Sequence, residues 1–130
     1  MKIIYQTATG VAIIHPTGEL SIEEVAAKDV PTGVPFRIVN DDEVPSDRTF
    51  RNAWKGDLTV DMPKAVEITK DRLRAERAPL IIAQDVAFQR ATETNTSTAA
   101  IVAEKQRLRD VTKLADKHGI TLDELKALVA

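Results

Sequence analysis

The feature that most constrains this chain is a long stretch, residues 61 to 92, with the composition and spacing of one helix. Asp61 is a suitable N-cap, and Pro63 in the first turn lacks only an amide that a helix leaves unpaired. Apolar residues recur every seven positions and form one stripe: Leu73, Leu80 and Ala87. Pro79 lies inside the stretch and crowds the carbonyl of residue 75, so the sequence predicts a kink or a break there.

A second helix is predicted from about residue 97 to His118, after a polar connector. Its apolar residues also keep helical spacing: Ile101, Leu108, Val111 and Ala115. Gly119 is a typical residue to end a helix, and Thr121 can cap a last short helix over residues 122–129. The two long helices are expected to pair as an antiparallel hairpin with a seam through Leu73, Leu80, Ile101 and Leu108.

The length of the first helix has a consequence for function. At about 1.5 Å per residue, a straight helix over residues 62–92 would be roughly 45 Å long. A compact globule of this size has a radius of gyration of only about 14 Å. The hairpin must therefore project, fold back at Pro79 or pack on another chain, and a projecting apolar seam favours a role in binding a partner.

The first 60 residues predict a small β-rich unit. Its expected elements are a β-hairpin over residues 2–15, strands over 34–39 and 58–60, a helix over 22–28 and a helical turn over 49–54. Ser21 and Glu24 have the spacing of a capping box at the start of that helix. The expected fold class is α+β: a β-rich unit over residues 1–60, then a long antiparallel helical hairpin and a short C-terminal helix over residues 61–130.

The residue types that carry catalysis or bind metals are scarce. The absence of cysteine excludes disulfides, thiolate metal sites and cysteine nucleophiles. His15 and His118 have no catalytic neighbours in the sequence, and no phosphate loop, nucleophile elbow or zinc-protease motif occurs. The acidic residues at 41–43 and 47 lack the spacing of an EF-hand and are interpreted as a solvated loop. We therefore expect no cofactor, no metal and no enzyme activity.

The charges and the N-terminus restrict the partners. The chain has a net charge of −2, with 18 basic and 20 acidic residues well mixed, so it predicts neither nucleic acid nor an anionic membrane as a partner. Basic residues at 70, 72, 74 and 77 are interleaved with acidic ones and can form exposed pairs on the helix. No apolar run reaches the roughly 20 residues that span a bilayer. The N-terminus does not resemble a signal peptide, so we expect a protein of the cytoplasm.

Residues 114–125 offer an alternative function. These residues predict the end of one helix, a turn at Gly119 and a second helix capped by Thr121. The second and third helices of a helix-turn-helix are joined in a similar way. The would-be recognition helix starts with Asp123 and Glu124 and offers only Lys126 as a base, which favours a structural corner. A small DNA-binding regulator that uses residues 105–129 remains the alternative.

The most unusual segment is residues 47–54, which holds the only tryptophan together with a phenylalanine and two arginines. Phe50 and Trp54 are four residues apart. One interpretation makes them core residues that close the N-terminal unit. The other makes them an anchor for another protein, because tryptophan and arginine contribute a large share of the energy of interfaces.

This segment, with the sequence DRTFRNAW and followed by an arginine-rich helix, resembles small proteins encoded among the tail-fibre genes of tailed bacteriophages. The helical region extends the resemblance. Residues 71–80 (DRLRAERAPL), then Asp85, Phe88 and Ala91, and residues 105–112 (KQRLRDVT) resemble the helical hairpin of phage tail assembly chaperones. The resemblance covers residues 47–112, although residues 101–103 hold Ile, Val and Ala where the family pattern usually carries an aromatic residue.

The resemblance implies a phage tail or tail-fibre accessory protein that acts by protein–protein contact. It would be a fibre assembly chaperone in the host cytoplasm or an adaptor in the virion tail. The implied partner is a phage tail or tail-fibre protein, with a second copy of the chain as a further partner. The expected contact residues are Arg48, Phe50, Arg51, Trp54, Arg72, Leu73, Arg77, Leu80, Phe88, Leu108 and Arg109.

Overall fold

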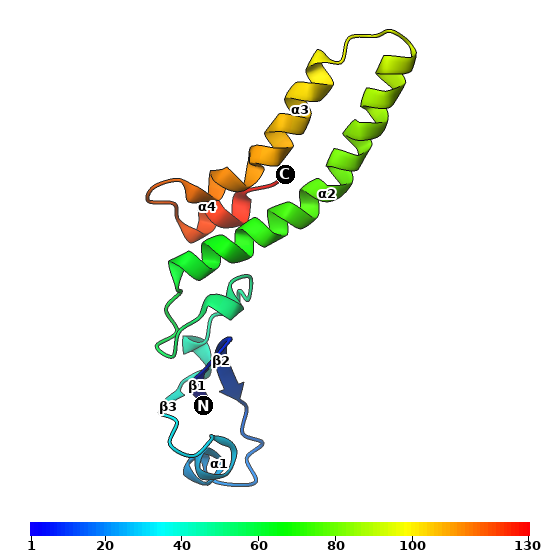
Figure 1. Cartoon of the computed structure of the whole chain (residues 1–130). Helices are drawn as coiled ribbons and strands as arrows, with labels where there is room; N and C mark the ends of the chain where they lie inside the picture. Colours follow the sequence, from blue (N-terminus) through cyan, green and yellow to red (C-terminus); the bar gives the residue numbers. More distant parts are fainter. The chain divides into compact units, whose positions relative to one another are not determined.

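The computed structural model describes all residues, 1–130, and its class is α+β, as predicted. The elements in chain order are β1 (Lys2–Thr7), β2 (Gly10–Ile14), α1 (Ile22–Asp29), β3 (Phe36–Val39), the 3-10 turns η1 (Asp41–Glu43) and η2 (Arg51–Ala53), α2 (Met62–Glu93), α3 (Ala99–Asp110), the 3-10 segment η3 (Val111–Asp116) and α4 (Leu122–Ala127) (Figure 1). The chain divides into two compact units, residues 1–65 and 66–130, which are described separately. The sequence placed this boundary at residue 60.

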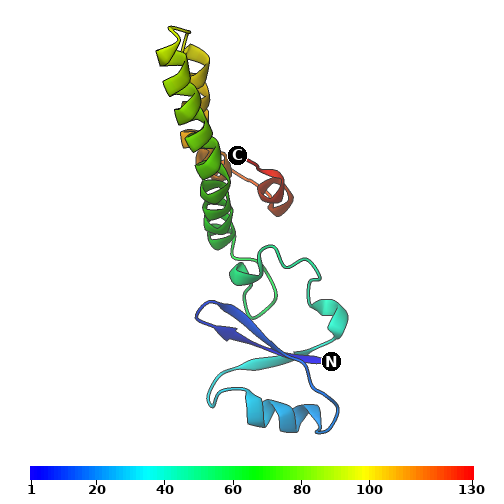
Figure 2. The ribbon, with the colours of Figure 1, turned by 90° about the vertical axis from the view of Figure 1, so that its right-hand side faces the viewer.

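The first unit is built on a three-stranded antiparallel sheet in the order β2-β1-β3. Side chains of a strand alternate between the two faces, so neighbouring residues of β1 enter different clusters. Ile3 packs with α1, through Val25, Ala26 and Val30. Ile4 packs on the opposite face with Trp54 and three valines. Figure 2 shows α1 along one face of the sheet and the segment that follows β3 toward the other.

The helix α1 begins with the capping box that the sequence predicts. The Ser21 hydroxyl accepts a hydrogen bond from the Glu24 amide at 3.2 Å, and the Ser21 amide donates to the Glu24 carboxylate at 2.8 Å. The hydrogen bond from the Ser21 amide lowers the pKa of Glu24, and the Ser21 side chain lowers it further. The helix ends at Asp29, two residues before Pro31.

Three expected elements of the first unit are smaller than predicted. The helical turn over residues 49–54 is reduced to η2, which covers Arg51–Ala53. Residues 58–60 form no strand, only a bridge between Trp54 and Val60, because a tight turn leaves room for a single pairing. Leu58 takes a positive φ of 64° in that turn. The third strand begins at Phe36 rather than at residue 34, after Pro35.

The long helix α2 runs through Pro79 without interruption, so of the predicted kink or break only the break is wrong. Figure 1 shows a bend partway along the helix instead. A proline removes one intrahelical hydrogen bond, but its flanking residues here are mostly Ala, Leu, Ile, Arg and Glu. Most of these residues favour helices strongly enough for the helix to continue on both sides.

The second half of the predicted hairpin also differs. The α-helix α3 ends at Asp110, and the chain continues as the 3-10 segment η3 to Asp116 rather than as α-helix to His118. Gly119 then takes a positive φ of 72°, as a residue after a helix end often does. The last helix, α4, ends at Ala127, two residues earlier than predicted, and the Thr121 hydroxyl caps its N-terminus.

The core of the second unit lies at one end of the hairpin. Its buried residues there come from α2, α3, η3 and α4: Leu73, Leu108, Val111, Ala115 and Leu125. Leu80 does not belong to this core, because its side chain is 42% exposed, so its place in the predicted seam is wrong. The reason lies in the packing. Figure 1 shows α4 beside the first half of α2, whereas only α3 runs beside the second half.

Candidate protein-contact site

The residues that the sequence predicted as partner contacts fall into three groups. Four are buried inside the chain itself: Phe50, Trp54, Leu73 and Leu108. Trp54 packs on the sheet with Ile4, Val11, Val39 and Val44. A partner could reach these side chains only if the chain opened. These four side chains are therefore not part of the accessible surface.

Two arginines of α2 form the second group, and they hold the ends of other helices. Arg72 donates to the carbonyl oxygens of Leu128 at 2.7 Å and Leu125 at 3.0 Å, at the C-terminal end of α4. Arg77 donates to the carbonyl of Arg109 at 2.9 Å, at the end of α3. The last carbonyls of a helix have no partner within it, and a cation there also interacts well with the helix dipole.

Arg72 also forms an ion pair with Glu76 at 2.8 Å, one turn further along α2. The Arg72 guanidinium lowers the pKa of Glu76, and the amide of Ala130, which donates to the same carboxylate at 3.2 Å, lowers it further. The sequence had indicated only exposed pairs on the surface of α2. In the structure this pair is continuous with the hydrogen bonds that hold α4 and the C-terminal residue.

The third group is exposed and consists of Arg48, Arg51, Leu80, Phe88 and Arg109. Phe88 lies beside Lys105 of α3, whose ammonium is 5.4 Å from the centre of its ring. The same ammonium is 2.6 Å from the Asp85 carboxylate. This ion pair joins α2 to α3 near Phe88.

The structure adds three exposed apolar residues that the sequence prediction missed: Ile82, Val86 and Val102. Ile82 and Val86 are one turn apart and lie on the same face of α2. Together with Leu80 and Phe88 these residues make up what we call the hairpin patch; their exposed fractions are 42% for Leu80, 63% for Ile82, 45% for Val86, 37% for Phe88 and 49% for Val102.

A signal for this patch was present in the sequence. Residues 78–83 are six apolar residues in a row, and no charged residue occurs from 78 to 84. Such a segment of helix is apolar on all sides, whereas a single neighbouring helix can cover only one side. The excess of apolar residues therefore predicts an uncovered face, which the seven-residue repeat alone does not reveal.

The helix-turn-helix-like corner is held by contacts within the second unit. Lys117 forms an ion pair with Glu124 at 2.6 Å, which lowers the pKa of this glutamate. The would-be recognition helix α4 has six residues, and its Leu125 is buried. These contacts fit a structural corner.

No group of three or more His, Asp or Glu side chains is placed to hold a metal ion. No helix has both the length and the apolar character needed to cross a membrane. No protein-family model, curated protein or solved structure matches the chain. Its function is therefore inferred from its own residues and their arrangement.

Proposed function

We propose that this protein is a tail or tail-fibre accessory protein of a tailed bacteriophage and that it acts by protein–protein contact. The contact surface is the hairpin patch on α2 and α3. The partner is a phage tail or tail-fibre protein, which the chain binds in the host cytoplasm during assembly. The motifs in residues 47–54, 71–80 and 105–112 support the phage assignment.

The observation that carries the contact function is the exposure of the hairpin patch. Single exposed apolar residues are common, but here five large ones occur within residues 80–102 of one hairpin, with Ile82 and Val86 on one side of α2 and Leu80 and Phe88 on the other. Ile82 and Val86 are neighbours one turn apart on the same face of α2, and adjacent exposed apolar side chains on a folded chain mark a site of interaction. The arrangement also fits an apolar helix face that binds a groove in its partner.

The contact function is tested by placing a charge in the patch. Ile82→Glu keeps a strong helix former on α2 but brings a carboxylate into the proposed interface. Copurification with the tail-fibre protein should fall at least tenfold in cells that produce phage particles. Ala75→Glu adds the same charge at an exposed position of α2 outside the patch, two turns before Ile82, and should bind normally. Equal binding by the two variants would contradict a contact through the patch.

The two forms of the proposal, chaperone and virion adaptor, differ in what remains in the finished particle. Mass spectrometry of purified particles should find the chain in stoichiometric amounts if it is an adaptor. A chaperone should be absent from the particles, and its deletion should stop fibre assembly. Normal fibres on particles that lack the chain would contradict both forms.

A further inference from the structure

The strand β3 has a free backbone edge. It is the last strand of the sheet on its side and pairs only with β1. No other backbone hydrogen bond involves residues 36–39. An edge strand presents unpaired N–H and C=O groups on its outer side, and these can pair with another extended chain. Phe36 and Ile38 of this strand are also exposed, so the edge is not covered by other parts of the first unit.

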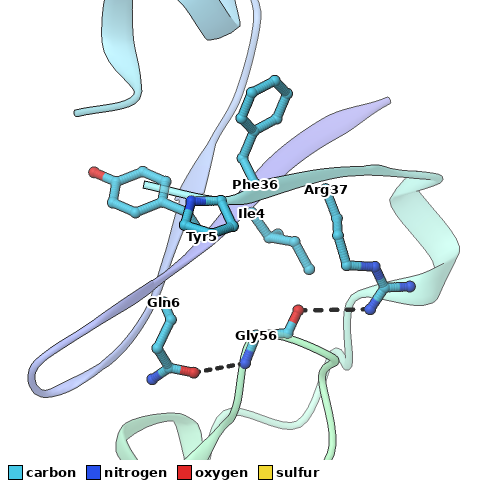
Figure 3. Close-up of a pocket in the computed structure, with 7 residues that line it drawn as sticks. Ile4, Tyr5, Gln6, Phe36, Arg37 and Gly56 are labelled. Atoms are coloured by element: carbon cyan, nitrogen blue, oxygen red, sulfur yellow. Dashed lines mark hydrogen bonds between the residues drawn. The ribbon is translucent and has the colours of Figure 1, made fainter. Parts of the chain in front are cut away.

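A pocket of about 250 Å³ opens beside this edge. Its lining is mostly apolar and includes Ile4, whose side chain is buried, and Phe36. The Gly56 peptide group lies across the pocket between two side chains of the sheet. Its N–H donates to the Gln6 side-chain oxygen at 2.6 Å, and its carbonyl oxygen accepts from Arg37. Figure 3 shows Gln6 and Arg37 on either side of Gly56, with Ile4 directed toward it.

Arg37 is the one charged residue that lines the pocket, and it forms no ion pair. The hydrogen bond that its guanidinium donates to the Gly56 carbonyl is long, at 3.5 Å. An exposed guanidinium has five N–H donors in a planar fork that matches a carboxylate. Arg37 is therefore placed to bind an anionic group at the mouth of an apolar pocket.

We propose that β3 binds an extended peptide from another protein, which adds a fourth strand to the sheet. One apolar side chain of the peptide occupies the pocket, and an acidic side chain two residues away pairs with Arg37. The spacing follows from strand geometry, because residues two apart lie on the same face and an added strand lies about 4.8 Å from its neighbour. Backbone hydrogen bonds supply affinity and the two side chains supply specificity. This site is independent of the hairpin patch.

The test uses two capped hexapeptides, Thr-Leu-Thr-Glu-Thr-Thr and its variant with Lys in place of Glu. Each is titrated to millimolar concentration into the full chain and into Arg37→Glu, with amide chemical shifts as the readout. The natural chain should prefer the Glu peptide by about tenfold, and Arg37→Glu should prefer the Lys peptide. Lys28→Glu is a charge-reversal control on α1, and it should retain the preference of the natural chain.

Amide hydrogen exchange distinguishes strand addition from simple occupation of the pocket. Binding of the Glu peptide should slow the exchange of amides in residues 36–39. Shift changes without slower exchange would overturn the added strand, and so would the absence of binding to the natural chain. Preferences that do not reverse in Arg37→Glu would overturn the role of Arg37. If Arg37→Glu does not fold, Arg37→Gln replaces it and should bind both peptides equally.

Discussion

At the scale of single residues, the arginines of α2 show how the tertiary environment changes the role of a side chain. The sequence presents four basic residues at positions 70, 72, 74 and 77 of one helix, and all except Arg77 have an acidic residue three or four positions away. Arg74 does form such a pair, with Asp71 at 2.6 Å. Arg72 pairs with Glu76 and also reaches carbonyl groups more than 50 positions away, and Arg77 reaches a carbonyl group 32 positions away. Spacing along a helix can predict the first kind of contact but not the second.

The contacts of Arg72 predict that its replacement lowers the free energy of unfolding more than the replacement of Arg74 does. Arg72→Met removes the donors to the ends of α4, and the carbonyl groups of Leu125 and Leu128 lose their partner. We expect a loss of about 1–3 kcal/mol in the free energy of unfolding, measured with urea. Arg74→Met removes only an exposed pair and should cost less than about 0.5 kcal/mol. Equal losses would contradict the role assigned to Arg72.

The lowered pKa of Glu76 predicts that the stability of the fold depends on pH. Its pKa is lowered by Arg72 and by the Ala130 amide, so the folded state favours the charged carboxylate. The stabilisation is complete above the ordinary glutamate pKa of about 4.3 and is lost as the pH falls through the lowered value. NMR titration of the side-chain carboxyl should show the lowered pKa, and Arg72→Met should raise it toward the ordinary value. An unchanged pKa in this variant would mean that Arg72 is not the main cause.

At the scale of elements, the two ends of α2 were predicted well, but its continuity at Pro79 and the exposure of Leu80 were not. Its N-terminal start and its end near residue 92 follow from capping residues and helix-forming composition. A kink or a break at Pro79 was inferred from a local rule, and the helix continues there without a break. The exposed position of Leu80 could not be read from the seven-residue repeat, because it depends on where α4 stops covering α2.

Replacement of Pro79 by alanine is predicted to stabilise the fold. Pro79 is exposed on α2 and deprives the helix of one hydrogen bond, so Pro79→Ala should restore that bond without loss of buried surface. We expect an increase of about 1–3 kcal/mol in the free energy of unfolding, because proline inside a helix costs about 3 kcal/mol relative to alanine. A decrease in urea experiments would show that the bend is needed to pair α2 with α3.

At the scale of the whole molecule, the chain consists of two units that each have buried residues of their own. The first unit holds the only tryptophan, in the cluster with Ile4. The second holds most of the helical residues, because α3, α4 and most of α2 belong to it. Tryptophan fluorescence therefore reports on the first unit, and far-ultraviolet circular dichroism reports mainly on the second.

The division into two units predicts that Leu73→Ala shifts the midpoint measured by circular dichroism and the midpoint measured by fluorescence by different amounts. Leu73 is fully buried in the second unit, and Leu73→Ala should cost about 2–5 kcal/mol there. The urea midpoint measured by circular dichroism should fall much more than the midpoint measured by Trp54 fluorescence. Coincident midpoints that fall together would mean that the chain unfolds in one cooperative transition.

The sequence by itself determined the fold class, the capping box of α1, the extent of α2 and the turn at Gly119, because these depend on neighbours within a few residues. It also contained a sign of the hairpin patch, in the six apolar residues before Gln84. Only the tertiary structure decided that Trp54 is a core residue and that Arg72 and Arg77 bind the ends of other helices. It also decided that Arg37 lies beside a pocket without an ion pair. Burial and long-range hydrogen bonds depend on which elements pack together, and the pattern along one element does not specify its neighbours.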